Sequence, residues 1–170
     1  MFWKELRESR WRFIIGLIVF VLFAASLPLL YEWLFKEFLK ETLKTVPFPL
    51  PKEALAQIEL MEKQYDFYIW SQWFGKNLYQ FGTILAILMG MGLFASEASK
   101  QTMEFLLSKP ISRNRVALVK FLVGALEIAI IVAVSSFSIY PAAKFTGHDV
   151  ELSKLIIGSV PTCVGLLLIF

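Results

Sequence analysis

The sequence has very few of the side chains that disulfides and metal sites require. It contains one cysteine, Cys163, and one histidine, His148. A single cysteine excludes a disulfide within the chain, and a single histidine excludes the His-Glu-x-x-His zinc motif. The Gly-x4-Gly-Lys-Ser/Thr phosphate loop is also missing. We therefore expect that this chain has no catalytic or metal site and binds no cofactor, and that it does not hold ATP through such a loop.

Charged residues are scarce as well. They make up 18% of the 170 residues, whereas hydrophobic residues make up 57%, and the mean hydropathy is +0.63. The charges fall in blocks between long uncharged runs, which excludes a disordered tail, a coiled coil and a nucleic-acid-binding module. The small basic excess lies beside apolar segments, where it meets anionic lipid. The sequence predicts an all-α membrane protein whose partner is the lipid bilayer and not nucleic acid.

Four apolar runs have the character of membrane-spanning helices. They cover residues 13–30, 78–95, 121–140 and 155–170. A helix needs ~20 residues to cross the ~30 Å hydrocarbon layer of a bilayer. The fourth run is shorter than that and reaches the last residue. We expect residues 1–170 to form a single polytopic transmembrane helix bundle that is incomplete at its C-terminus.

The arginines indicate how these runs are oriented. All of them lie before the first run or between the second and third: Arg7, Arg10, Arg12, Arg113 and Arg115. The loop of residues 32–76 contains lysines and acidic residues but no arginine. Because cytoplasmic segments carry the excess of basic residues, we expect the N-terminus and the connection 96–120 in the cytoplasm and the loop outside. This describes a multi-pass protein of the plasma membrane.

The segments outside the apolar runs also show helical patterns. Residues 2–13 have apolar side chains near one helical face, which predicts an N-terminal helix lying in the membrane interface, although a basic flank without its own helix is the alternative. In the external loop, residues 34–44 predict an amphipathic helix and residues 52–65 a second short one, with alternate prolines between them. The aromatic residues of 65–81 favour an interfacial belt or loop packing over an aromatic substrate cage.

The connection between the second and third runs is too apolar for a plain solvated loop. Met103, Leu106 and Leu107 share one helical face, and Pro110 disfavours helix at the residue before it. This pattern predicts a short cytoplasmic helix that ends in a sharp turn. Apolar side chains rimmed by charges are typical of a docking surface for a protein or a membrane, although the turn alone could simply end one helix and start the next.

The same connection resembles that of a known family, the membrane permeases of type-2 ABC exporters. The shared pattern comprises Glu97, Thr102, Glu104, Leu106, Leu107, Pro110, Ile111, Ser112 and Arg113. Gln101 departs from it, because many members have glycine before the threonine. The basic N-terminal segment, the first span and the long external loop also fit, so the likeness covers essentially the whole chain at the level of topology.

The resemblance implies a permease subunit of an ABC transporter whose spans continue beyond Phe170. A separate ATPase subunit would bind ATP and Mg, and a second permease protomer would complete a homo- or heterodimer. Transport would be export, with the substrate open among drugs, lipids, peptides, ions and polysaccharides. The resemblance assigns the ATPase contact, the coupling helix and its supporting turn to Thr102, Glu104, Leu106, Leu107, Pro110 and Arg113.

Two other classes of protein compete with a permease. A non-transporting membrane scaffold or assembly factor would use the external loop to bind a partner, and it would tolerate scrambling of residues 100–112. An intramembrane enzyme has weak support, because neither His148 nor Cys163 has a plausible catalytic neighbour in the sequence.

One carboxylate, Glu127, lies inside the third apolar run. A charge at the centre of a bilayer is costly, so this residue must face protein or water, or stay protonated. Lys120 is about 10 Å away along the helix axis at ~1.5 Å per residue, so a direct pair would stretch both side chains. Three interpretations stay open for this intramembrane polar site: a residue of the transport path, a hydrogen bond between packed helices, and a group that snorkels to the boundary.

Overall fold

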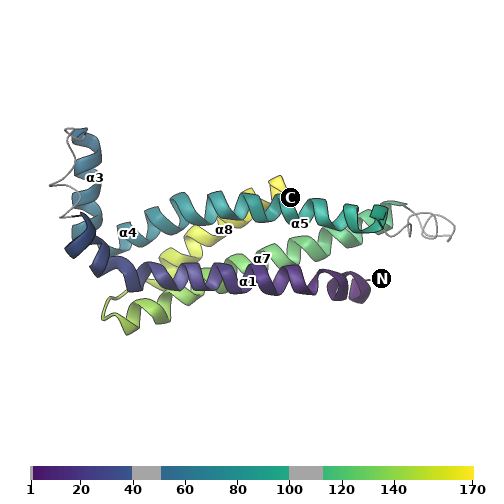
Figure 1. Cartoon of the computed structure of the whole chain (residues 1–170), viewed down its shortest axis with the longest axis horizontal. Helices are drawn as coiled ribbons and strands as arrows, with labels where there is room; N and C mark the ends of the chain where they lie inside the picture. Colours follow the sequence, from purple (N-terminus) through teal and green to yellow (C-terminus); the bar gives the residue numbers. More distant parts are fainter. Residues whose placement is uncertain (1, 40–50, 100–112) are drawn as a thin grey trace.

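The protein is a bundle of long helices. The computed structural model describes residues 2–39, 51–99 and 113–170, and the regular structure among them is entirely helical. The bundle consists of α1 (Phe2–Trp33), α5 (Leu78–Ser99), α7 (Arg113–Phe145) and α8 (Leu152–Ile169) (Figure 1). Between α1 and α5 lie η1 (Leu34–Phe38), α3 (Lys52–Lys63), α4 (Tyr65–Gln72) and η2 (Trp73–Asn77), of which η1 and η2 are π-helical turns. The expected all-α polytopic bundle is confirmed.

Three of the ranges expected to cross the membrane lie within α1, α5 and α7, and the fourth lies within α8 except for Phe170. Within the described residues, three stretches are long and apolar enough to cross a membrane: Phe2–Trp33, Asn114–Phe145 and Leu152–Ile169. The helices extend beyond the apolar runs, so that α1 begins at Phe2 and α7 at Arg113. A change from polar to apolar composition does not end a helix, because the backbone hydrogen bonds continue across it.

Two expected helix boundaries are wrong for this reason. Residues 2–13 do not form a helix of their own but are the first turns of α1. The external helix expected at 34–44 likewise begins without a break, because Trp33 has helical dihedral angles and η1 follows it directly. Residues 40–50, which include the rest of that helix and most of the proline segment, lie outside the described residues. The second external helix is present as α3 and ends at Lys63.

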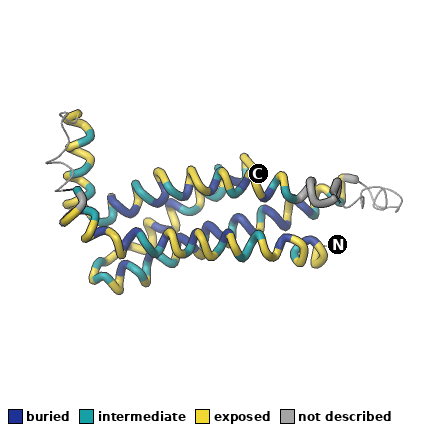
Figure 2. Tube along the Cα trace, in the orientation of Figure 1, coloured by how far each residue is buried: buried dark blue, intermediate teal, exposed yellow. Residues whose placement is uncertain are grey.

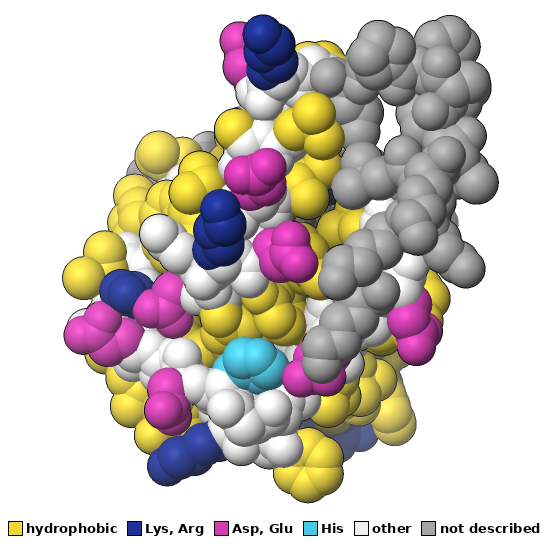
Figure 3. All heavy atoms as spheres, turned by 90° about the vertical axis from the view of Figure 1, so that its left-hand side faces the viewer, with side chains coloured by type: hydrophobic (Ala, Val, Ile, Leu, Met, Phe, Trp, Pro, Cys, Tyr) yellow, Lys and Arg dark blue, Asp and Glu magenta, His cyan; other side chains and the backbone are white. Residues whose placement is uncertain are grey.

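The chain ends and connections are divided between the two ends of the bundle. The N-terminus lies at the same end as the last turn of α5 and the first turn of α7, whereas α3, α4 and the turn between α7 and α8 lie at the other end (Figure 1). Gln64, in an extended conformation, separates α3 from α4, and α3 projects away from the bundle to one side (Figure 1). The end face with α3 carries both acidic and basic side chains (Figure 3).

Small residues bring the helices close together. A Cβ atom on Gly16 would lie 3.2 Å from Leu85 of α5 and 3.4 Å from Ile131 of α7. Ala24 and Ala143 are fully buried. Burial follows the inner faces of the helices, and their outer faces are exposed (Figure 2). Because those outer faces are largely apolar, they suit contact with lipid, where small residues at helix interfaces let backbones approach.

Candidate functional site

The predicted docking surface belongs to the connection between α5 and α7. Thr102, Glu104, Leu106, Leu107 and Pro110 lie outside the described residues, and Arg113 is the first residue of α7. The docking role of these six residues stays a prediction. The structure does describe the two long helices that the connection joins, and it places both junctions at the N-terminal end of the bundle (Figure 1).

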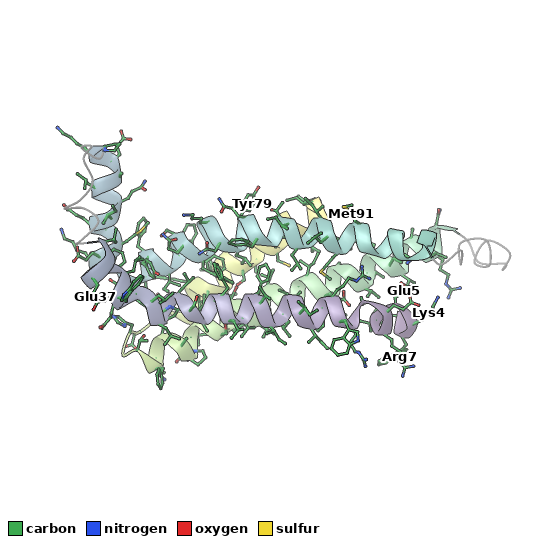
Figure 4. The ribbon with its side chains drawn as sticks, in the orientation of Figure 1. Lys4, Glu5, Arg7, Glu37, Tyr79 and Met91 are labelled. Carbon is green, nitrogen blue, oxygen red and sulfur yellow. The ribbon has the colours of Figure 1, made fainter. Side chains whose placement is uncertain are left out.

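A row of buried polar side chains joins α1 to α7 near this end. It consists of Glu5, Ser9, Lys120 and Glu127, which we call the polar seam. Each of these residues is at most 3% exposed. Glu5 and Arg7 lie on opposite sides of α1, and Arg7 points away from the bundle (Figure 4). The apolar residues of 2–13 therefore do not share one surface in the membrane interface, because Phe2 is exposed and Phe13 packs against the core, beside the inward-facing Glu5 and Ser9.

The first pair of the polar seam is a buried ion pair. Nζ of Lys120 donates to Oε2 of Glu5 across 3.2 Å, and both side chains are at most 4% exposed. Removing two charges from water carries a desolvation cost that only close pairing and further hydrogen bonds can offset. The pair therefore fixes the first turns of α7 against the first turns of α1.

The second pair places Glu127 against α1. The Ser9 hydroxyl donates to Oε1 of Glu127, and the same hydroxyl lies 3.0 Å from the backbone oxygen of Glu5. Oε2 of Glu127 is buried and has no hydrogen-bond partner among the described residues. The contact is a hydrogen bond between packed helices, and any part that Glu127 has in a transport path stays a prediction.

Helical spacing explains the polar seam, and this signal was available in the sequence. Glu5, Ser9 and Arg12 are separated by four and three residues, so they lie on one face of α1. Lys120 and Glu127 are seven residues apart and share a face of α7 in the same way. Lys120 and Glu127 do not pair with each other along α7, because each has a partner on α1.

Arg12 extends the basic end of α1 toward α5. A Cβ atom on Gly92 would lie 1.7 Å from a guanidinium nitrogen of Arg12, so the guanidinium lies directly over the α5 backbone. Arg12 is also close enough to Glu127 to interact with it electrostatically. A side chain at position 92 would require the flexible Arg12 guanidinium to move.

The other end of the bundle is closed by aromatic rings. Tyr31 of α1 contacts the rings of Phe35, Tyr65 and Tyr68 at centroid distances of 4.8 to 4.9 Å. His148 stacks on Tyr65 at 4.3 Å. Burial raises the pKa of Tyr68 to about 12, and the neighbouring Tyr31 acts in the same direction, so the phenol of Tyr68 stays neutral at physiological pH.

Some aromatic residues of 65–81 belong to the core, whereas Phe67, Trp70, Tyr79 and Phe81 are exposed. Tyr68 and Trp73 are at most 2% exposed, and the Trp73 indole N–H donates to the Ser136 hydroxyl at 3.0 Å. The Trp73 ring thus packs against α7, and the Tyr68 ring packs against Tyr31 of α1, so neither lines an open cage. Tryptophan and tyrosine commonly pack in this way, with the ring buried and the polar atom hydrogen-bonded.

Metal ligands and catalytic nucleophiles were sought among the described residues. Within 2–39, 51–99 and 113–170, no three His, Cys, Asp or Glu residues come together in a group that could hold a metal. Cys163 is a free, partly buried thiol on α8. His148 lies in the aromatic cluster described above.

Comparison with known proteins gives a match at the level of the family. The model of a family described as ABC-2 family transporter protein matches residues 1–170. No curated protein and no solved structure matches the chain. The family match covers both the bundle and the connection that lies outside the described residues.

Proposed function

Because the chain belongs to the ABC-2 family of transporter proteins, we propose that it is the permease subunit of an ABC exporter in the plasma membrane. A separate ATPase subunit binds ATP and Mg, and a second permease protomer, identical or related, completes the transporter. The N-terminus and the connection 96–120 face the cytoplasm. The match of the family model to residues 1–170 is the observation that carries this proposal.

In the proposed mechanism, the ATPase acts through the connection between α5 and α7. Six residues of this connection together form the ATPase contact and its supporting turn: Thr102, Glu104, Leu106, Leu107, Pro110 and Arg113. When the ATPase closes on ATP, the connection moves and carries the ends of two long helices with it. The arrangement of α5 and α7 supports this step, because each helix runs from the connection through the bundle.

The polar seam couples the movement of α7 to α1. Lys120 lies two turns into α7, and its ion pair with Glu5 is buried. A displacement that left Glu5 behind would expose or separate two buried charges, which is costly. We therefore expect α1 and the first turns of α7 to move as one body, while α5 moves relative to them.

The experiment that tests the proposal is purification of the full chain from its native membrane in mild detergent. We expect a soluble ATPase to co-purify in stoichiometric amount. The double variant Leu106→Asp/Leu107→Asp should release it, because carboxylates in an apolar contact carry a large desolvation cost.

A matched control places the same substitutions at the opposite end of the molecule. Leu55 and Leu60 of α3 are 38% and 44% exposed, and Leu55→Asp/Leu60→Asp should retain the ATPase. If no ATPase co-purifies under conditions that keep other membrane complexes intact, the permease proposal fails. A partner lost only through the α3 variant would instead favour the membrane scaffold.

A further inference from the structure

An open apolar groove runs between α1 and α5. It has a volume of about 700 Å³. Its lining includes Arg12, Val19, Phe23, Ile84, Leu88 and Gly92. Val19, Ile84 and Leu88 are each more than half exposed, so the groove opens on the outer surface of the bundle.

The two ends of the groove differ. At one end the rings of Phe23 and Phe81 meet edge to face at 5.3 Å between centroids and close it. At the other end the Arg12 guanidinium lies over Gly92. From Arg12 to Phe23 the helix rises about 16 Å at ~1.5 Å per residue. This is close to half of the ~30 Å hydrocarbon layer, so the groove has the depth of one leaflet.

The positive charge in the groove favours an occupant with a negatively charged group. Among the described residues that line it, Arg12 is the only charged one. It lies about three turns into α1, beyond Lys4 and Arg7 of the first turns (Figure 4). Arg12 also interacts electrostatically with Glu127, so an anion bound there shares the guanidinium with that carboxylate. A guanidinium is well suited to bind phosphate oxygens, and basic residues near a membrane surface attract anionic lipids.

We propose that this groove binds one acyl chain of an anionic phospholipid from the leaflet on the N-terminal side, with the lipid phosphate at Arg12. The chain lies along Val19 and Leu88 and ends at the contact between Phe23 and Phe81. This binding does not require that the protein transports lipid or any other substrate.

The dimensions of the groove argue against a helix as its occupant. A helix with its side chains is about 10–12 Å wide, and one that crosses the membrane needs the full ~30 Å of depth. The contact between Phe23 and Phe81 closes the groove after one leaflet. A spanning helix of a second copy would have to pass over these two exposed rings, whereas an acyl chain ends there.

Native mass spectrometry of the delipidated full chain tests the proposal at the head group. Phosphatidylglycerol and phosphatidylcholine are added separately, and the fraction of protein with one bound lipid is measured. We expect phosphatidylglycerol to bind more tightly. Arg12→Gln should weaken its binding about fivefold, the effect of losing one basic contact to an anionic lipid. The control Arg10→Gln removes an exposed charge that is not among the groove residues and should bind like the wild type.

A second pair of variants tests the acyl-chain site. Val19→Trp fills the groove from an exposed position and should reduce lipid binding, whereas Leu22→Trp, on the same helix but outside the groove, should not. Equal binding of both lipids, or wild-type binding by Arg12→Gln and Val19→Trp, would overturn the proposal. Loss of a dimer through Val19→Trp with unchanged lipid binding would also overturn it and assign the groove to a second copy.

Discussion

At the scale of single residues, the polar seam raises the question of why charges are retained in a helix contact. A buried ion pair adds little net stability compared with apolar residues, but breaking it leaves one charge buried without its partner. We therefore expect the Glu5–Lys120 pair chiefly to determine how α1 and α7 are aligned along their length. Among alternative alignments of α1 and α7, only the observed one brings these two charges together.

The first prediction concerns removal of one member of this pair. Lys120→Met should destabilise the protein by about 3–5 kcal/mol, because it leaves the Glu5 carboxylate without its ammonium partner in a buried position. The measurement is the apparent melting temperature of the detergent-solubilised chain, followed by circular dichroism. The double variant Glu5→Leu/Lys120→Met should recover most of the loss, because two apolar side chains can pack together there.

The matched control is an exposed ion pair on the same helix. Lys4 and Glu8 are 3.8 Å apart, with side chains 54% and 34% exposed. Exposed pairs of this kind are worth little, so Lys4→Met should leave the melting temperature almost unchanged. Equal effects of Lys4→Met and Lys120→Met would show that burial of the pair has no energetic consequence.

At the scale of elements, α8 packs against η2 at a glycine, Gly158. A Cβ atom on Gly158 would lie 2.6 Å from the Phe74 ring of η2, whereas nothing lies within 4 Å of the same position on Gly165. We predict that Gly158→Ala destabilises the bundle by about 1–3 kcal/mol, because a buried aromatic ring must shift to make room. Thermal unfolding in detergent measures the change.

Gly165→Ala provides the control on the same helix. Its new methyl group enters open space and alanine favours helix over glycine, so this variant should be as stable as the wild type or more so. Similar losses at both positions would mean that α8 does not rest on Phe74. A loss only at Gly165 would place the packed face of α8 on the opposite side.

The sequence predicted where the helices run better than where they begin. Apolar runs identify spans because hydrocarbon excludes unpaired backbone and charge. A helix over residues 2–13 was predicted, but its packing inside the bundle as the first turns of α1 was not, because Glu5 and Ser9 look like solvated residues until Lys120 and Glu127 are seen opposite them. The partner of a buried charge on another helix depends on tertiary packing, which the pattern of one segment does not contain.

At the scale of the whole molecule, sequence and structure contribute different parts of the candidate site. The motif from Glu97 to Arg113 indicated the family from the sequence alone, and the family match agrees with it. The structure adds two features near that motif. They are the buried ion pair between Lys120 and Glu5 of α1 and the groove with Arg12 at its end. Neither could be predicted from the motif, because both join residues that are distant in the sequence.

The arrangement of the bundle also predicts which segments are accessible from each side of the membrane. Lys4 and Lys63 are exposed and lie at opposite ends, on the first turns of α1 and on α3. In a Cys163→Ser background, Lys63→Cys should react with a membrane-impermeant maleimide on intact cells. Lys4→Cys should react only after permeabilisation, because the arginine-rich end faces the cytoplasm. The reverse pattern would contradict the cytoplasmic N-terminus but keep the bundle, whereas labelling of both variants on intact cells would contradict the placement of these residues on opposite sides of the membrane.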